Sequence, residues 1–271
     1  MSAPDDARHE RYTHGHHESV LRSHSWRTID NSAAYLAPHL LAGHRVLDVG
    51  CGPGTVTAEL ADRVGPEGSV VGVDTSAEVI ALASRRQSRP NASYEVGDVY
   101  WLDAADDSFD VVHAHQLLQH VADPVAALRE MRRVCRPGGL VAVRDADYTG
   151  SGWFPDDALL DEWLSLSLAL GRANGGEPDA GRRLLSWARA AGFADVTPSA
   201  SVWCFATPSE RAWWAELWAD RVTQSAFAEQ SVSEGRATSD ELAAIADAWR
   251  RWASDDSAWF AVLHGEILAR A

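Results

Sequence analysis

Short apolar runs alternate with helical patterns between residues 44 and 148 of the 271-residue chain. Such runs are typical of strands buried on both faces of a parallel sheet. Between them, apolar residues recur at spacings of three, as at Val125, Leu128 and Met131, which predicts amphipathic helices. The predicted strands are 45–50, 69–74, 92–96, 109–114 and 139–146, and the predicted helices are 55–64, 77–87 and 124–134. The pattern therefore predicts an α/β fold, with helices on both faces of a mostly parallel sheet.

The second half of the chain adds two strands and more helices. A helix is expected over 182–191, and strands are expected near 196–204 and 258–269, which gives a seven-stranded sheet. Two amphipathic helices, near 209–230 and 239–253, interrupt these strands. We therefore divide the chain into an N-terminal lid segment, 1–34, and one domain, 35–271. Helical cap insertions are expected at about 152–178 and 208–256.

Ten of the twelve tryptophans lie beyond residue 150. Two apolar stripes follow the predicted cap helices, and their members are Trp213, Trp214, Leu217 and Trp218, then Leu242, Ile245, Trp249 and Trp252. The favoured interpretation is burial of both stripes against the core. In the alternative, they partly line an aromatic substrate pocket at the edge of the sheet.

Charge and cysteine content narrow the class of partner. A formal net charge of −15 argues against a nucleic acid, because phosphate contacts require clustered Lys and Arg, and it favours a neutral or cationic small molecule. The three cysteines form no CxxC pair, which indicates a reducing cytoplasm without a disulfide framework or zinc site. No apolar run reaches the length of a membrane span, and the N-terminus has no signal core. We expect a soluble cytoplasmic protein, with a homodimer as one option.

A glycine loop carries the most specific chemical signal. The predicted strand at 45–50 contains Asp48 and leads through Gly50, Gly52 and Gly54 directly into a helix. Glycine lets the backbone approach a ligand closely. The dinucleotide pattern G-x-G-x-x-G would require glycine at position 55, where Thr55 stands, so a nicotinamide-dependent oxidoreductase is disfavoured.

This segment resembles the first motif of the class I methyltransferases, D/E-x-G-x-G-x-G. Asp74 ends the second predicted strand, and Gly97-Asp98-Val99 follows the third, where this family places the ribose and adenine contacts. FDVV then opens the fourth strand, and RPGG precedes the fifth. The chain is most similar to small-molecule methyltransferases of the ubiquinone and menaquinone biosynthesis group. The resemblance implies a Rossmann-like fold and S-adenosyl-L-methionine as cofactor, with S-adenosyl-L-homocysteine as product.

The resemblance also assigns residues to parts of the cofactor. The methionine end falls to Asp48, Gly50, Cys51 and Gly52; the ribose to Asp74, Thr75 and Ser76; and the adenine to Gly97, Asp98 and Val99. Three further residues, Tyr12, His115 and Gln116, are expected beside the cofactor. Tyr12 belongs to a histidine-rich segment that we expect to fold over the cofactor as a lid, with the ring near the sulfonium.

The methyl acceptor is expected where the fourth and fifth strands end. His115, His120, Asp147 and Tyr12 are the candidate catalytic residues. His120 suits a general base, although a structural role for it is equally open. Asp147 could anchor or deprotonate an amine. Relatives that bind a metal here have E-x-x-E-H, whereas this chain has Gln116-x-x-Gln119-His120, so no catalytic metal is expected.

The sequence thus predicts an enzyme that methylates an oxygen, nitrogen or carbon of a small, part-aromatic metabolite. The alternative is a regulatory module that binds S-adenosylmethionine without turnover. An RNA or DNA methyltransferase is disfavoured by the negative charge and by HAHQ at 113–116, where a base-methylating enzyme would carry an NPPY-like motif.

Overall fold

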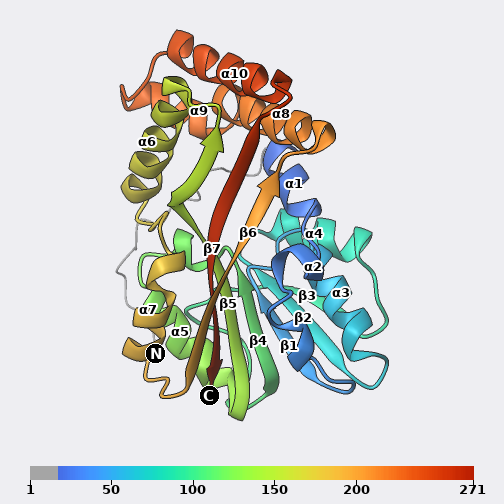
Figure 1. Ribbon diagram of the computed structural model, residues 1–271. Helices are drawn as coiled ribbons and strands as arrows, with labels where there is room; N and C mark the ends of the chain where they lie inside the picture. Colours follow the sequence, from blue (N-terminus) through green and yellow to red (C-terminus); the bar gives the residue numbers. More distant parts are fainter. Residues whose placement is uncertain (1–17) are drawn as a thin grey trace.

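The computed structural model describes residues 18–271 (Figure 1). Within them a single sheet has the strand order β3-β2-β1-β4-β5-β7-β6. Its strands are β1 Arg45–Val49, β2 Ser69–Asp74, β3 Ala92–Val96, β4 Phe109–His115, β5 Cys135–Phe154, β6 Val196–Phe205 and β7 Trp259–Arg270. β7 runs antiparallel to both of its neighbours, and the other pairs are parallel. The predicted mostly parallel, seven-stranded sheet is confirmed.

Helices cover both faces of the sheet because successive strand residues point to opposite sides. On one face, Val46 packs in a core with residues of α2 (Ile29–Ser32) and α3 (Thr55–Val64). On the other, Leu47 packs in a core with residues of α5 (Pro124–Val134) and α7 (Leu184–Ala190). The remaining elements of the sheet domain are α4 (Ala77–Arg86), η1 (Ala37–His39), η2 (Leu118–His120) and η3 (Gly181–Arg183).

A helical cap forms a third core at one end of the sheet, where β5, β6 and β7 extend beyond the other strands (Figure 1). It comprises α6 (Ala158–Ala173), α8 (Pro208–Gln224), α9 (Ala226–Ser233) and α10 (Ser239–Ser254), and α1 (Glu18–Ser25) packs against α8. The ring of Trp163 lies 4.6 Å from that of Trp218 and 4.9 Å from that of Trp249. All three are fully buried, so the aromatic stripes serve chiefly as the core of the cap, as the favoured interpretation has it.

Two boundaries differ from the prediction. The helix expected at 209–230 is broken at Ser225, whose hydroxyl donates to the carbonyl of Arg221 and accepts from the amide of Phe227. α8 therefore ends at Gln224, and Ser225 caps the start of α9. β5 is longer than expected: it begins at Cys135 and continues past an irregularity between Asp147 and Gly152 into the cap. None of the described helices is long and apolar enough to cross a membrane.

Candidate active site

The loop between β1 and α3 presents backbone to a cavity of about 350 Å³. Gly50, Gly52 and Gly54 have φ angles of 72°, 55° and 79°, which favour glycine. A Cβ atom on Gly50 would lie 3.1 Å from the side chain of Leu117, and one on Gly54 would lie 2.6 Å from the ring of Tyr94. Gly50 and Gly52 line the cavity, whose volume falls in the range of small-molecule sites. The glycines thus give a ligand close access to the main chain.

Asp48 is buried in β1, two residues before the first glycine of this loop. Its buried carboxylate accepts a hydrogen bond from the Thr57 hydroxyl at 2.6 Å and lies 2.8 Å from Nδ1 of His113. The Cys51 thiol is also buried, and burial, together with the Asp48 carboxylate, raises its pKa well above the ordinary value. Both residues line a separate, smaller cavity beneath the loop. The contacts of Asp48 therefore tie β1 to α3, on the far side of the loop, and to β4, and its carboxylate does not line the large cavity.

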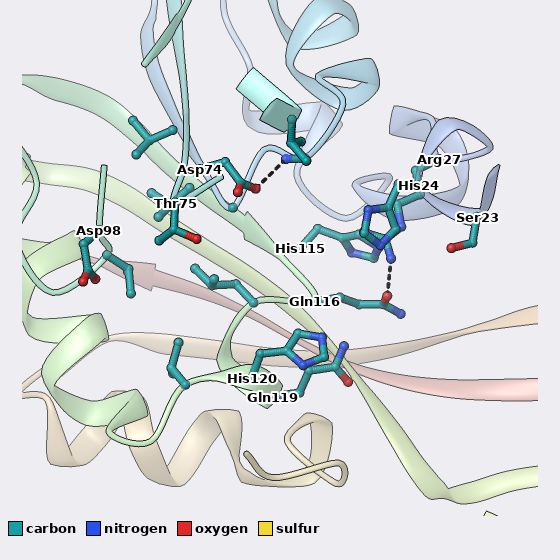
Figure 2. A pocket seen from close by; sticks show the side chains of 18 of the residues that line it. Ser23, His24, Arg27, Asp74, Thr75, Asp98, His115, Gln116, Gln119 and His120 are labelled. Atoms are coloured by element: carbon teal, nitrogen blue, oxygen red, sulfur yellow. Dashed lines mark hydrogen bonds between the residues drawn. The ribbon is translucent and has the colours of Figure 1, made fainter. Parts of the chain in front are cut away.

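Asp74 ends β2 with its carboxylate facing the large cavity (Figure 2). One oxygen accepts from the amide of Gly52 at 3.1 Å, and the other accepts from the amide of Ser76 at 3.0 Å. Thr75 also lines the cavity, whereas the hydroxyl of Ser76 caps α4 by accepting from the amide of Val79. Asp74 thus couples the glycine loop to the end of the neighbouring strand.

The end of β3 completes the half of the cavity that we term the loop half, with Gly50, Gly52, Asp74, Thr75, Gly97, Asp98 and Val99. The amide of Gly97 donates to the carbonyl of Asp74 at 3.1 Å, and a Cβ atom there would lie 2.9 Å from Val73. The Asp98 carboxylate accepts from the amide of Tyr100 at 2.9 Å, which fixes its direction. The structure thus brings the predicted ribose and adenine residues, except Ser76, to one end of a single cavity.

The cavity continues into a second half, the cap half, between β4, η2 and the helical cap. The N-terminal region, the segment after β4 and the cap side contribute Ser23, His24, Arg27, His115, Gln116, Gln119, His120, Tyr148, Trp203, Trp214, Arg221 and Val262 (Figure 2 labels the first seven). Two aromatic residues of the cap side, Trp203 and Trp214, thus reach the cavity. Of the two predicted stripes only Trp214 lines it, so the alternative interpretation of the stripes holds for that one residue.

Gln116 connects three elements at the boundary between the two halves. Its φ of 52° is uncommon for a residue other than glycine, and its amide donates to the carbonyl of Arg144 at 2.7 Å. Nδ1 of His264 lies 3.1 Å from the carbonyl of Val262, so that nitrogen carries the proton and Nε2 accepts from the Gln116 side-chain amide at 2.9 Å. The side-chain oxygen of Gln116 then accepts from Arg27 at 2.5 Å. Gln116 thereby holds Arg27 beside the cavity.

Two histidines of the cap half are neutral. Burial, with the charges of Arg27 and Arg144, lowers the pKa of His115 well below its ordinary value. Burial, with the charges of Arg27 and Arg221, lowers the pKa of His120 to about 3. A neutral imidazole has a lone pair that can accept a proton, so each ring could act as a base.

The lowered pKa of His120 predicts a loss of stability in mild acid. An unfolded histidine binds a proton below about pH 6.5 whereas half-buried His120 in the folded protein does not, so the free energy of unfolding falls as the pH drops below that value. We expect His120→Gln to reduce the loss between pH 7 and pH 5 by up to about 2 kcal/mol, measured by denaturant unfolding. The exposed His39, changed in the same way, is the control. Equal losses in wild type and His120→Gln would contradict the neutral state.

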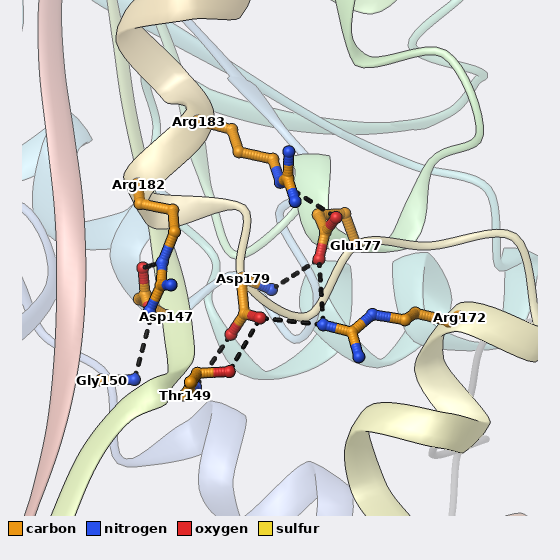
Figure 3. Close-up of polar contacts among 8 residues, drawn as sticks. All are labelled: Asp147, Thr149, Gly150, Arg172, Glu177, Asp179, Arg182 and Arg183. Atoms are coloured by element: carbon orange, nitrogen blue, oxygen red, sulfur yellow. Dashed lines mark hydrogen bonds and ion pairs between the residues drawn. The ribbon is translucent and has the colours of Figure 1, made fainter.

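Asp147 is engaged in an ion pair away from the cavity lining. Its carboxylate lies 2.5 Å from both Nε and Nη2 of Arg182 and accepts from the amide of Gly150 (Figure 3). Close by, Asp179 accepts from the amide and the hydroxyl of Thr149. These contacts tie β5 to the segment before α7. They leave the predicted role of Asp147 toward an amine without support, because its carboxylate pairs with Arg182 and does not line the cavity.

Asp145 is buried beneath η2 and fixes it. Its carboxylate accepts from the amides of Leu118 at 3.0 Å and Gln119 at 3.3 Å. Burial raises its pKa to about 7, although these two hydrogen bonds act in the opposite direction. The amide of Glu177 donates to the carbonyl of Gln119 at 2.9 Å, so the loop after α6 supports η2 from the other side.

Tyr12 and the predicted lid segment, 1–34, lie outside the described residues, except for the part from residue 18 onward.

Neither Arg27 nor Arg221 is predicted from the sequence, although both line the cavity. Arg221 did leave a signal, because it falls three residues after Trp218 and seven after Trp214, on the apolar side of its helix. A single arginine on an apolar stripe predicts a buried cation. Arg27 follows the first helix and shows no such pattern.

Together, the sheet order, the glycine loop and the acidic residues at the ends of β2 and β3 define a Rossmann-like protein that binds a nucleoside-containing ligand at the carboxyl ends of its strands. Comparison with known proteins agrees. A sequence model for a family described as a methyltransferase domain matches residues 40–174. An uncharacterized methyltransferase of Schizosaccharomyces pombe is 35% identical over 99% of this chain and 98% of its own length.

Two further relatives are more distant. The demethylmenaquinone methyltransferase of Beutenbergia cavernae is 40% identical over 51% of this chain and 55% of its own. The phosphoethanolamine N-methyltransferase 2 of Haemonchus contortus, solved with S-adenosylmethionine, shares the fold at 17% identity, with a TM-score of 0.55 over 88% of this chain and 51% of its own. The chain belongs to the class I S-adenosylmethionine-dependent methyltransferases, and S-adenosylmethionine is its cofactor.

Proposed function

We propose that the protein transfers the methyl group of S-adenosylmethionine to an oxygen, nitrogen or carbon of a small, part-aromatic metabolite. The observation that supports this most is the single cavity of about 350 Å³, which is lined at one end by the loop half and at the other by the cap half. Aromatic walls from Tyr148, Trp203 and Trp214 suit a flat acceptor. The helical cap closes over the end of the sheet, and the cavity that it covers has room for a small molecule.

The residues of the loop half fit the cofactor. Each carboxylate oxygen of Asp74 has lone pairs beyond the one used by Gly52 or Ser76, so the group can also accept from both ribose hydroxyls. Asp98 would accept from the adenine amino group, and Val99 would pack on the ring. The backbone of Gly50 and Gly52 would hold the methionine end.

A cation is available for the carboxylate of the methionine end. Arg27 lines both the large cavity and the smaller one beneath the glycine loop, and Gln116 holds its guanidinium at the boundary. His24 lies nearby, because a Cβ atom on Gly52 would be 3.5 Å from its Nδ1. We assign the methionine carboxylate to Arg27, and we assign to Asp48 the support of the loop rather than a direct contact.

When bound, S-adenosylmethionine supplies an electrophilic methyl group on a cationic sulfur. The chain must then align the acceptor and, where needed, remove its proton. His120 is placed for this task because it lines the cap half, where the acceptor would lie, although the charges of Arg27 and Arg221 weaken it as a base. In this proposal neutral His120 is the general base, and His115 is a neutral wall beside the transferred group.

The test is transfer of a labelled methyl group. Purified protein would be incubated with S-adenosylmethionine labelled in the methyl group and a small-molecule extract, and labelled products would be separated by chromatography and identified by mass. We expect label in a small molecule, dependent on the protein and lost in His120→Gln if a proton is removed. Cofactor binding without transfer to any small molecule would favour a regulatory module and contradict the proposal.

A further inference from the structure

Arg221 brings a buried positive charge from the cap to the cavity. It lies on α8, is 4% exposed and lines the cap half. Its Nη2 donates to the Ser23 hydroxyl of α1 at 3.1 Å, and its guanidinium carbon lies 4.6 Å from the centroid of the Trp218 ring. A guanidinium has five N–H donors in a planar fork, so the group can donate to a ligand while these contacts hold it.

The described lining of the cap half contains cationic side chains and no anionic ones. Among the described residues that line it, Arg27 and Arg221 are cationic and none is a carboxylate, because Asp74 and Asp98 belong to the loop half. Asp220, next to Arg221 in sequence, is ion-paired with Arg22. Arg221 contributes to the lowered pKa of His120. At Tyr148 the charges of Arg221 and Arg27 oppose the burial that raises the pKa, and the buried Asp145 carboxylate adds to it.

We propose that Arg221 binds an oxyanion group, a carboxylate or a phosphate, on the methyl acceptor. The flat part of the acceptor would then lie against Trp203, Trp214 and Tyr148, which line the same half of the cavity. Arg27 is assigned to the cofactor, so each anion has its own cation. The inference rests on the proposed function for the identification of this ligand as the methyl acceptor.

An anionic acceptor also has a consequence for His120. Arg221 is one of the charges that lower the basicity of this imidazole. An oxyanion bound to Arg221 would offset that charge and so remove one of the three causes of the lowered pKa of His120, while burial, the largest cause, and the charge of Arg27 would remain. The base would then become stronger when the acceptor is in place. A cationic acceptor would be repelled by the positive charges of Arg27 and Arg221.

A set of matched aromatic probes tests the inference by binding rather than turnover. Phenylacetate, benzylphosphonate, neutral phenylacetamide and cationic phenethylamine would be titrated by ligand-observed NMR, with and without S-adenosylhomocysteine. We expect the better of the two anions to bind at least about tenfold more tightly than the amide, and phenethylamine to bind most weakly. The relative affinities of phenylacetate and benzylphosphonate distinguish a carboxylate from a phosphate.

Variants separate the role of Arg221 from general damage to the cap. Arg221→Met should abolish the preference for an anion, and Arg221→Lys should retain part of it. Arg211→Met is the matched control, because Arg211 is a buried arginine of the same helix that donates to the carbonyls of Ala206 and Ala253 and does not line the cavity. All three variants should bind S-adenosylhomocysteine like wild type.

The outcomes distinguish this inference from the proposed function. If the intact protein binds no S-adenosylhomocysteine, the proposed function fails, while the probe series without cofactor still measures the charge preference. If the amide or phenethylamine binds as well as the anions, or if no anion binds, the inference is overturned. An anion preference that survives in folded Arg221→Met also overturns it.

Discussion

Replacing Asp74 with alanine is expected to weaken the binding of S-adenosylhomocysteine by about a hundredfold or more, while the protein stays folded. The carboxylate would supply two charge-assisted hydrogen bonds to the ribose diol, and their loss costs roughly 3 kcal/mol. The same change removes the acceptor for the amide of Gly52, which loosens the glycine loop that faces the methionine end. Calorimetric titration of the variant measures the effect.

Two controls limit the interpretation of this result. Asp103 is an exposed aspartate outside the cavity lining, so Asp103→Ala should bind S-adenosylhomocysteine like wild type. Asp74→Asn should fall between wild type and Asp74→Ala, because an amide retains one acceptor oxygen. If folded Asp74→Ala binds within about threefold of wild type, the ribose is held elsewhere, and the assignment of the loop half is wrong.

Replacing Gly265 with alanine is expected to lower the free energy of unfolding strongly. β7 passes η3 in direct backbone contact here: a Cβ atom on Gly265 would lie 2.0 Å from the carbonyl oxygen of Gly181, and one on Gly181 would lie 2.7 Å from the amide nitrogen of Gly265. Both partners are main chain, so the strand or the turn must move. Overpacking of this kind costs about 3 kcal/mol, which lowers the Tm by roughly 5–10 °C in a domain of this size.

The matched control is another glycine of the same sheet. Gly152 pairs with β7 through Ala261, and a Cβ atom there would come no closer than 3.6 Å to Trp259. Gly152→Ala should therefore shift the Tm by less than about 2 °C. Because Gly265 pairs with Asp145, whose carboxylate holds η2, Gly265→Ala should also impair the cap half. Equal Tm values for Gly265→Ala and wild type would contradict the close contact.

Local signals account for what was predictable from the sequence. The first five strands and the glycine loop depend on runs of neighbouring residues, so their ends were placed to within a few residues, apart from the long β5. The break at Ser225 was missed, because a serine within an amphipathic pattern gives little warning that its side chain will cap a new helix.

The cap half could not be assembled from the sequence, because its residues come from distant segments. Asp147 was a reasonable candidate directly after the predicted strand 139–146, but its partner Arg182 lies 35 residues further along the chain. Gln116 owes its role to Arg27 and His264, which are 89 and 148 residues away from it. Only a folded chain shows that such side chains meet.

Net charge and local charge also differ. The chain carries a formal charge of −15, which suggests a neutral or cationic ligand. The described lining of the cap half nevertheless contains two arginines and no carboxylate, which is the basis for proposing an anionic acceptor there. The acidic residues of the chain are largely elsewhere, on the surface or in ion pairs such as that of Asp220 with Arg22.

Titration of the purified protein with S-adenosylhomocysteine by calorimetry tests the central claim most directly, with NAD titrated in parallel. The account predicts one saturable site for S-adenosylhomocysteine, with a dissociation constant on the order of micromolar, and no binding of NAD. Absence of heat from S-adenosylhomocysteine at millimolar concentration, in a protein shown to be folded, would contradict it. Tighter binding of NAD than of S-adenosylhomocysteine would contradict it as well.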